Sequence, residues 1–460
     1  LVESSLFTGK EQSKAMDVSS SCQLTIQVNE YEYNVIKKSS TVAQSTILLG
    51  RSGTGKTTCA LYKMWFEYQS YWESTNPSMP RYPGKDVTSY SHIHQVFVTA
   101  NPVLRAEIHR IFHSLKVGNL AHLPFDLGLN NTESNYPPTL HDVDYRKFPL
   151  FLTSRQWILM VDGTLDEPFF ARRPDGSMIE KKFQNYQNDE SRYILSSLRM
   201  LRDLEEIKEE AEEAEDDKFL PHVEVDYEYF ACVVWPNIKP SGCAHHPSLV
   251  FTEIYSFIKG SVESLQTDTG YLSLEEYKSL GRKRANTFSE EEEREEIYEI
   301  FLEYEKFKQN HRWEVTLFDW MDVIYHCYRH LCKTPYKGIP IHSMVHDEVQ
   351  DATQAELSLY FLLGNSNELF FTGDTCQTIA RGVGFRFSDL RSLFHYKNQI
   401  DQRTFIPEIT HLERNYRSHG GITNLAGAVV ELMRFFSPNS FDSDLPKDQG
   451  ILPGNPPLLL

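Results

Sequence analysis

A short glycine-rich stretch carries residue types that bind phosphate. Glycines let a backbone turn tightly enough for its N–H groups to converge on an anion, at a helix N-terminus that favours negative charge. The stretch consists of Gly50, Arg51, Ser52, Gly53, Thr54, Gly55, Lys56, Thr57 and Thr58. We predict that it binds ATP, with Lys56 on the β- and γ-phosphates and the Thr57 hydroxyl on Mg²⁺. An ordinary glycine-rich turn is the alternative.

Three polar stretches farther along each follow an apolar run. The first contains Asp347 and Glu348, the second ends at Gln377, and the third contains Tyr416 and Arg417. Asp347 is a candidate ligand of Mg²⁺, and Glu348 a candidate base that orients and deprotonates the attacking water. Gln377 could sense the γ-phosphate, Arg417 could pair with it, and Tyr416 could stack on adenine. A solvated polar turn is the alternative for each.

The apolar runs have the length of buried strands, and helical patterns lie between them. Such alternation predicts an α/β fold with a parallel sheet and a ligand at the carboxyl ends of its strands. Strands are expected at 46–49, 95–99, 341–346, 368–372 and 409–414, and helices at 58–68, 101–111 and 355–363.

The stretch 115–310 interrupts this rhythm, and we interpret it as an inserted, mostly helical subdomain. Its segment 203–217 holds ten acidic residues and one lysine, which is typical of a solvated helix or a disordered insert. Cys243, His245 and His246 could ligate a metal ion. A structural zinc site usually takes four ligands, so a polar loop is the favoured interpretation of this group.

Composition narrows the class of protein. The net charge of −18 over 460 residues argues against a broad basic surface for nucleic acid, but not against a local groove. No signal peptide or membrane-spanning apolar run is visible. Seven scattered cysteines without a Cys-x-x-Cys pair predict a reducing, intracellular compartment, nuclear or cytoplasmic. A chain that starts at Leu1 and ends in an apolar run is expected to be part of a longer protein.

The sequence contains five short motifs that together resemble those of superfamily 1 helicases of the UvrD/Rep type. Their order and spacing carry the resemblance, and the closing Asp351 of the third favours the UvrD branch. The longer stretches 50–58 and 379–387 are similar to the helicase-like region of the large tetratricopeptide-and-ankyrin-repeat proteins. The five motifs are Gly55–Thr57, Thr99–Asn101, Asp347–Asp351, Gly373–Gln377 and Asn415–Ser418.

The resemblance implies a RecA-like P-loop NTPase with ATP and Mg²⁺ between two lobes and single-stranded DNA or RNA across them. The remainder of the parent chain would then complete the second lobe. The implied division is a flexible lead-in at 1–23, a first ATP-binding lobe at 24–114 and 311–411, the inserted subdomain at 115–310, and the start of the second lobe at 412–460.

The sequence departs from that family at three points. The family's adenine-reading glutamine has no clear counterpart, since Glu32 or Tyr33 falls near its place. Gly382 falls at or near the tryptophan that stacks on a base, a contact worth about 1–3 kcal/mol, and Phe385 or Phe387 is a possible substitute. The family's second γ-phosphate arginine would come from beyond residue 460.

Two functions of different classes remain open. The first is ATP binding and hydrolysis as the N-terminal half of a UvrD-like helicase or nucleic-acid-stimulated ATPase, which Lys56, Glu348, Gln377 and Arg417 favour. The second is a nucleotide-binding regulatory module of a large scaffold protein without unwinding activity, which the missing tryptophan and the acidic balance favour. Without the second arginine, this chain is expected to bind ATP and to hydrolyse it slowly.

Overall fold

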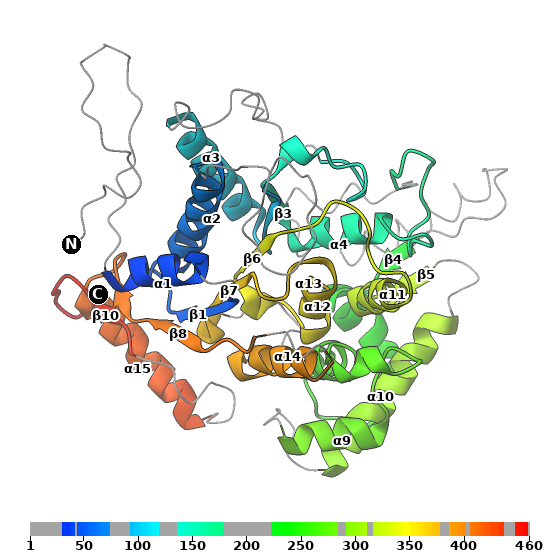
Figure 1. The fold of residues 1–460 in the computed structure, drawn as a ribbon. Coiled ribbons are helices and arrows are strands. Elements are labelled where there is room, and N and C mark those ends of the chain that lie inside the picture. The colour runs from blue at the N-terminus through cyan, green and yellow to red at the C-terminus, as the bar shows by residue number, and fades with distance from the viewer. Residues whose placement is uncertain are drawn as a thin grey trace, which may run out of the picture.

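The computed structural model describes residues 30–41, 44–73, 93–118, 136–178, 222–283, 291–310, 316–377, 386–400, 405–436 and 447–458. Within these ranges a six-stranded parallel β-sheet forms the centre of the molecule (Figure 1). Its strands, in spatial order, are β3 (Leu150–Thr153), β2 (Gln95–Thr99), β6 (Ser343–Asp347), β7 (Leu369–Gly373), β1 (Thr46–Gly50) and β8 (Ile409–Leu412).

The register of the sheet brings all the strand ends that carry candidate residues to one edge. Every neighbouring pair is parallel, so the carboxyl ends of the strands lie together. Thr99 at the end of β2 is level with Asp347 at the end of β6, and Gly50 is level with Leu412. β1 lies between β7 and β8, so the loop that follows it is flanked on both sides.

Alternate side chains of the strands enter different hydrophobic clusters, so both faces of the sheet are buried. Leu48, Phe97 and Phe370 pack in one cluster with side chains of α1 (Glu30–Thr41), α2 (Lys56–Glu73) and α3 (Pro102–Gly118). Ile47, Val98 and Phe371 pack in another. Helices supply that second layer, namely α4 (Ser154–Gly163), α11 (Trp320–Lys333), α12 (Gln354–Ser358), α13 (Tyr360–Leu363) and α14 (Phe387–Ile400).

The predicted α/β fold with a parallel central sheet is confirmed, and the strand predictions hold to within two residues at either end. β2 matches its prediction at 95–99, and β1 and β7 each run one residue beyond theirs. β6 contains a histidine although it is wholly buried. Burial lowers the pKa of His346 to about 3, so its imidazole is neutral and fits a buried strand.

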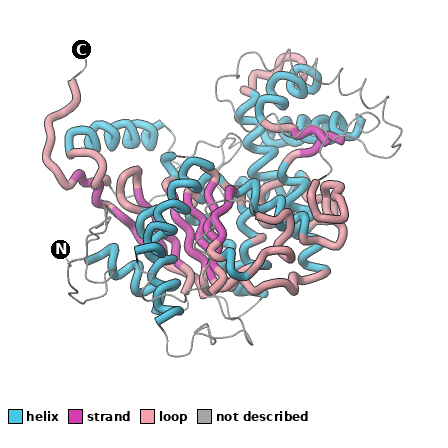
Figure 2. The backbone as a smooth tube through the Cα atoms, turned by 90° about the horizontal axis from the view of Figure 1, so that it is seen from above, coloured by secondary structure: helices cyan, strands magenta, loops and turns pink. Residues whose placement is uncertain are grey.

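A second group of helices lies to one side of the sheet and has its own hydrophobic cluster (Figure 2). Phe230, Phe251 and Tyr304 are fully or almost fully buried in it. The 3-10 turn η6 (Glu263–Gln266) lies outside this group, since its Leu265 packs in the cluster of the sheet layer. The elements of the group are β4 (His222–Glu224), α6 (Tyr227–Tyr229), α7 (Trp235–Ile238), α8 (Pro247–Thr252), α9 (Leu274–Lys283), α10 (Glu291–Asn310), and the π-helical turns η4 (Phe230–Val234) and η5 (Glu253–Ile258). We call this group the helical subdomain.

A buried ionic cluster joins the helical subdomain to α11. Lys259 donates to Asp319 at 2.5 Å and to Asp322 at 2.6 Å, and Lys308 of α10 donates to the same two carboxylates at 3.0 and 2.8 Å. Asp319 also caps the N-terminus of α11. Removing one partner of such a buried set leaves an uncompensated charge, so the cluster ties the subdomain to the sheet layer.

Two strand pairings cross the predicted limits of the insertion. β3 belongs to the main sheet although it lies inside 115–310, and β4 of that stretch pairs with β5 (Thr316–Phe318) beyond it. Four residues are too few to show the strand–helix rhythm on which the prediction depended. The lead-in 1–23, the acidic segment 203–217, Gly382 and Phe385 lie outside the described residues.

The last described elements follow β8. They are β9 (Arg414–Asn415), α15 (Gly420–Phe436) and β10 (Gln449–Gly450), and β10 pairs in parallel with β9. The short 3-10 turns η2 (Tyr145–Lys147), η7 (Val349–Asp351) and η8 (Thr375–Gln377) complete the fold. Among the helices described, none has the length and apolar character needed to cross a membrane.

Candidate functional site

The glycine-rich stretch forms the connection between β1 and α2. Gly53 has φ +81° and Gly55 has φ +90°, a left-handed conformation that glycine adopts without the steric cost of a side chain. A Cβ added to Gly53 would lie 2.7 Å from the Cβ of Arg417, so space as well as backbone conformation calls for glycine. The loop therefore depends on glycine at these two positions.

The loop closes around the carbonyl oxygen of Arg51. Thr54 donates its hydroxyl to that oxygen at 2.8 Å, and the Lys56 ammonium donates to it at 3.3 Å. Lys56 is the first residue of α2, and only 6% of it is exposed. A helix N-terminus carries partial positive charge, so the lysine adds a full charge where the backbone already favours an anion.

A hydroxyl and a carboxylate from distant parts of the chain meet beside this loop. Thr57 donates its hydroxyl to Asp347 at 2.6 Å across 290 residues of sequence, and Thr372 of β7 donates to the other carboxylate oxygen. Burial raises the pKa of the Asp347 carboxyl, the Glu348 charge raises it further, and the two hydroxyls and Lys56 oppose this. Oxygen donors of this kind suit Mg²⁺, so Thr57 and Asp347 fit the predicted metal ligands.

Glu348 has a strained backbone at the same edge. Its φ of 58° is left-handed, and it is the one non-glycine residue of the described chain with positive φ. Such a conformation costs on the order of 1–3 kcal/mol and is typical of functional sites. Gln350 donates its amide to Glu348 at 2.7 Å. The half-buried carboxylate is thus held next to the candidate metal ligand Asp347.

Gln350 also joins this site to the end of β7. Its amide oxygen accepts the Asp374 backbone N–H at 3.0 Å. Asp374 in turn accepts from the Gln377 amide at 2.5 Å and lies 3.7 Å from the Arg51 guanidinium. Gln377, predicted to sense the γ-phosphate, therefore points to Asp374 in this structure. Neither Gln350 nor Asp374 was predicted as a site residue, although both lie inside the sequence motifs.

The segment after β8 contacts the glycine-rich loop between β1 and α2 directly. Asn415 donates its side-chain amide to the Ser52 carbonyl at 2.7 Å, Tyr416 donates its backbone N–H to Gly53 at 2.9 Å, and Arg417 donates to the Ser52 hydroxyl at 3.1 Å. Arg417 is exposed, and Tyr416 is 45% exposed. The structure thus brings Arg417 and Tyr416 to the loop and adds Asn415, which sequence analysis quoted without a role.

Helix α1 covers the other flank of the loop. Glu32 is buried, and a Cβ added to Gly55 would lie 3.5 Å from its carboxylate. Burial, with the Glu32 charge as a second cause, raises the pKa of the Cys59 thiol. A carboxylate therefore lies close to the glycine-rich loop, on the segment where the resemblance predicts an adenine-reading glutamine. Tyr33, the next residue in the sequence, is half-buried.

Two further residues quoted from the motifs have structural roles. Asn101 caps α3, since its side chain accepts the backbone N–H groups of Val103 and Leu104 at 2.9 and 3.1 Å. Phe387 is fully buried at the start of α14. The suggestion that Phe387 stacks on a nucleic-acid base is therefore wrong, because its ring is used in the core beside Leu390 and Phe394.

A carboxylate from the last described segment also faces the loop. Asp448 precedes β10, and its carboxylate lies 3.9 Å from the Arg51 guanidinium. Partial burial raises the pKa of Asp448 to about 6, with Arg51 lowering it and Asp374 raising it. No sequence pattern indicates a role for Asp448, because a single aspartate among prolines and glycines resembles any polar turn.

Comparison with known proteins gives two informative similarities. The chain is 35% identical over 534 aligned residues, covering 96% of its length, to TPR and ankyrin repeat-containing protein 1 of Homo sapiens. Over 130 residues, or 28% of this chain, it is 31% identical to ATP-dependent DNA helicase srs2 of Schizosaccharomyces pombe, of which the match covers 14%. No protein-family model matches the chain.

The chain spans only 18% of the length of the human protein. The similarity to the repeat-containing protein therefore extends along nearly all of this chain but over a small part of the relative. The similarity to the helicase is shorter and partial.

Proposed function

We propose that this chain binds Mg²⁺-ATP at the carboxyl edge of its sheet and hydrolyses it, as the ATP-binding region of a UvrD-like helicase or nucleic-acid-stimulated ATPase. The observation that carries the proposal is the contact between Thr57 and Asp347, next to Lys56 and Glu348. The glycine-rich loop that follows β1 meets there a candidate metal ligand and a candidate base, which both lie at the end of β6. The partial similarity to a DNA helicase supports the same function.

Each residue at this edge has a proposed task. Lys56 and the N-terminus of α2 bind the phosphates, and Thr57 and Asp347 hold Mg²⁺, which would neutralise charge on the β- and γ-phosphates. Glu348 orients and deprotonates the attacking water. Arg417 pairs with the γ-phosphate, and Tyr416 stacks on the adenine.

Gln377 has a task that requires a change of partner. To reach the γ-phosphate, its amide must leave the Asp374 carboxylate that it contacts at 2.5 Å. Asp374 also lies 3.7 Å from Arg51, so the loop and the sensor share one acceptor. Binding of nucleotide would thus be coupled to a rearrangement of Gln377, in keeping with the tightening of catalytic contacts on substrate binding.

We further propose a RecA-like first lobe from 24–114 and 311–411, with the insertion supplying β3 to its sheet, and a second lobe that starts at 412. Exposed apolar side chains on α15 support the proposal that residues 412–460 pack against further protein. Leu425, Val429, Leu432 and Phe436 are each more than half exposed, and contiguous exposed apolar surface of this kind is typical of an interface. The remainder of the parent chain is the proposed occupant.

A regulatory nucleotide-binding module of a large scaffold protein is the second candidate. The specific observation in its favour is the 35% identity to a repeat-containing protein along 96% of this chain. The burial of Phe387 agrees with it, because that ring cannot take the place of the missing base-stacking tryptophan.

The two functions differ in their response to single-stranded nucleic acid. ATP turnover by the full-length parent protein, measured with and without single-stranded DNA and RNA, separates them. If single-stranded nucleic acid raises the rate of ATP turnover by at least about tenfold, the result supports an ATPase that moves on a strand. Base contacts in such a protein are worth about 1–3 kcal/mol each, and part of this free energy would then favour hydrolysis. Nucleotide binding with strand-independent turnover supports the regulatory module instead.

Asp448 is expected to oppose nucleotide binding, because its carboxylate faces the loop that receives the phosphates. Asp448→Asn removes that charge and should tighten Mg²⁺-ATP binding about fivefold at pH 8, as expected for roughly 1 kcal/mol between like charges near a protein surface. The carboxylate has a raised pKa of about 6, so it is neutral well below that pH. The advantage of Asp448→Asn should therefore shrink as the pH falls from 8 to 5.5.

The measurement is the ratio of wild-type to variant dissociation constants by calorimetry at both pH values. Titration of the nucleotide itself cancels in this ratio. Glu413→Gln is the matched control, since Glu413 is an exposed carboxylate next to β9, the strand with which β10 pairs, and it should leave the affinity unchanged. A ratio near one at pH 8, or one that grows on acidification, would show that Asp448 does not repel the phosphates.

A further inference from the structure

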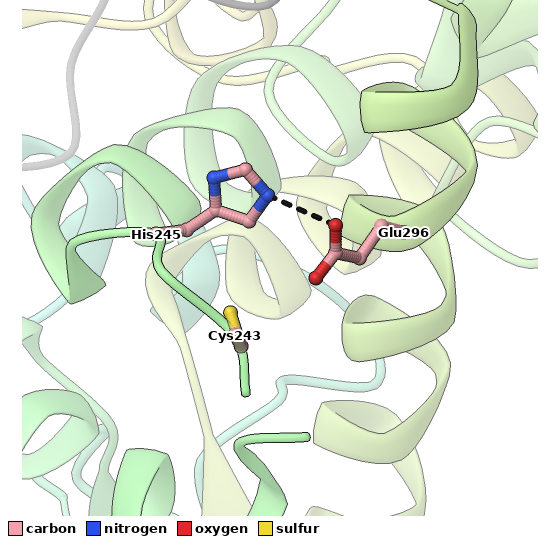
Figure 3. A group of neighbouring side chains, drawn as sticks. All are labelled: Cys243, His245 and Glu296. Carbon is pink, nitrogen blue, oxygen red and sulfur yellow. Dashed lines mark hydrogen bonds and ion pairs between the residues drawn. The ribbon is translucent and has the colours of Figure 1, made fainter. Parts of the chain in front are cut away.

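Three side chains of types that can ligate a metal ion lie together in the helical subdomain, away from the proposed ATP site. They are Cys243 and His245 of the loop that precedes α8, and Glu296 of α10 (Figure 3). One donor atom of each lies within 4.8 Å of the other two. The Nε2 atom of His245 is 3.2 Å from the Glu296 carboxylate.

We propose that Cys243, His245 and Glu296 form a binding site for one divalent transition-metal ion of the zinc type. Sulfur, imidazole and carboxylate are the three donor types that Zn²⁺ takes in proteins. With Zn–ligand distances of about 2.0–2.3 Å, tetrahedral geometry places donor atoms roughly 3.3–3.7 Å apart. The His245–Glu296 separation is already close to this, and the sulfur needs only a small side-chain adjustment. Water would complete the fourth position.

The local fold explains why His245 and not His246 is the ligand. His246 caps α8 by accepting the Ser248 backbone N–H at 3.2 Å, and its imidazole also contacts the Ser248 hydroxyl at 2.8 Å. Its side chain is thus used locally. Cys243 donates its backbone N–H to the Pro240 carbonyl at 3.1 Å in a tight turn, and its thiol lies near the His245 imidazole.

Sequence alone favoured a polar loop here, because only one close group of ligands was visible. Glu296 lies 51 residues after His245, on a helix whose acidic residues look like an ordinary solvated face. In the structure the third candidate metal ligand beside Cys243 and His245 is Glu296 of α10, and not His246. The contact with α10, which the sequence does not show, therefore favours a metal site over a polar loop.

Burial and access also suit a metal. Cys243 is buried in the subdomain core, the His245 side chain is 16% exposed, and the Glu296 side chain is 43% exposed. The buried thiol is shielded, while the carboxylate side is open for an ion to enter. A bound ion would pin the loop 239–246 to α10 and stabilise the folded subdomain by mass action.

Metal titration of the full 460-residue chain tests the proposal. After removal of metal with a chelator, Zn²⁺ should bind with one equivalent per chain and raise the thermal midpoint. Co²⁺ in its place should give the near-ultraviolet charge-transfer absorption of a thiolate ligand. Because ligands bind deprotonated, the affinity should fall on acidification.

Variants of the ligands and of their neighbours separate a built site from scattered binding. Glu296→Gln, His245→Gln and Cys243→Ser should each weaken Zn²⁺ binding by at least about tenfold, since each removes one of three protein ligands. Cys243→Ser should also abolish the Co²⁺ thiolate absorption. His246→Asn keeps a residue suited to the N-cap and should bind Zn²⁺ like the wild type. Cys232→Ser removes an exposed thiol elsewhere and should leave the Co²⁺ absorption intact.

Some results would overturn the proposal. These are Zn²⁺ affinity unchanged in Glu296→Gln and His245→Gln, a Co²⁺ complex without thiolate absorption, or absorption that is lost in Cys232→Ser. Because Cys243 is part of the core, its variant could unfold. Glu296→Gln changes a partly exposed side chain and keeps the test decisive, with the thermal midpoint in the presence of chelator as the check of folding.

Discussion

Lys56→Ala is expected to weaken Mg²⁺-ATP binding by roughly 10- to 100-fold, as follows from the loss of charge-assisted hydrogen bonds worth about 1.5–3 kcal/mol. Lys56 is almost buried at the start of α2, and its ammonium contacts the Arg51 carbonyl at a long 3.3 Å. A phosphate oxygen would be a stronger acceptor in the same place. Removing the cation leaves the loop backbone to bind the phosphates alone.

Calorimetry with this chain measures the effect. Lys56→Met keeps most of the apolar stem and should lose affinity to the same extent as Lys56→Ala, which separates charge from packing. Lys333→Ala, at an exposed lysine at the end of α11, is the control and should bind like the wild type. If Lys56→Ala and wild type bind with equal affinity while both remain folded, the loop does not bind ATP and the proposed function fails.

Glu348→Gln is expected to slow ATP hydrolysis by about 10²- to 10⁴-fold and to spare nucleotide binding, because it removes a general base without removing a phosphate ligand. The replacement is isosteric. Its amide oxygen can still accept the hydrogen bond that Gln350 donates at 2.7 Å, so the strained turn at this position should persist. What is lost is the capacity to take a proton from water.

The assay needs two lengths of chain. If the second arginine comes from beyond residue 460, this chain should hydrolyse ATP slowly, since an arginine of this kind is worth about 10³–10⁵ in rate. A longer version that continues through the proposed second lobe should recover turnover and then lose it in Glu348→Gln. Strong, strand-stimulated turnover by the 460-residue chain would contradict the expectation that an arginine from beyond residue 460 is required.

Glu356→Gln is a suitable control for Glu348→Gln. Glu356 lies eight positions further along, and burial raises its pKa to about 8, with Asp351 as a second cause. Its carboxyl is therefore protonated at neutral pH, and an amide replaces one neutral group by another. Turnover in the longer chain should be nearly unchanged. If Glu348→Gln has as little effect as Glu356→Gln, Glu348 is not the base.

The sequence by itself determined the local structure around the site. Apolar runs of four or five residues predicted β1, β2 and β7, because a strand buried on both faces needs apolar side chains at most positions. The glycines at 53 and 55 predicted a tight turn, and both take positive φ. These features depend on neighbouring residues only, so they can be inferred without knowing the rest of the chain.

Only the tertiary structure decided which of these elements meet. β3 was hidden in a stretch without rhythm, and its place in the main sheet depends on pairing with β2. Thr57 reaches Asp347 across 290 residues because β6, β7 and β1 are neighbours in the sheet. The order of strands follows from how helices pack on both faces, and no local pattern specifies it.

The hydrogen-bond partners of individual polar side chains also could not be predicted from the sequence. Gln350 and Asp374, Asn415 and Ser52, and the set of Cys243, His245 and Glu296 all depend on contacts between separate elements. A buried polar group must find a partner wherever packing places one. A sequence pattern specifies backbone conformation and burial through nearby residues, whereas a side-chain contact is specified by the distance between elements that only packing sets.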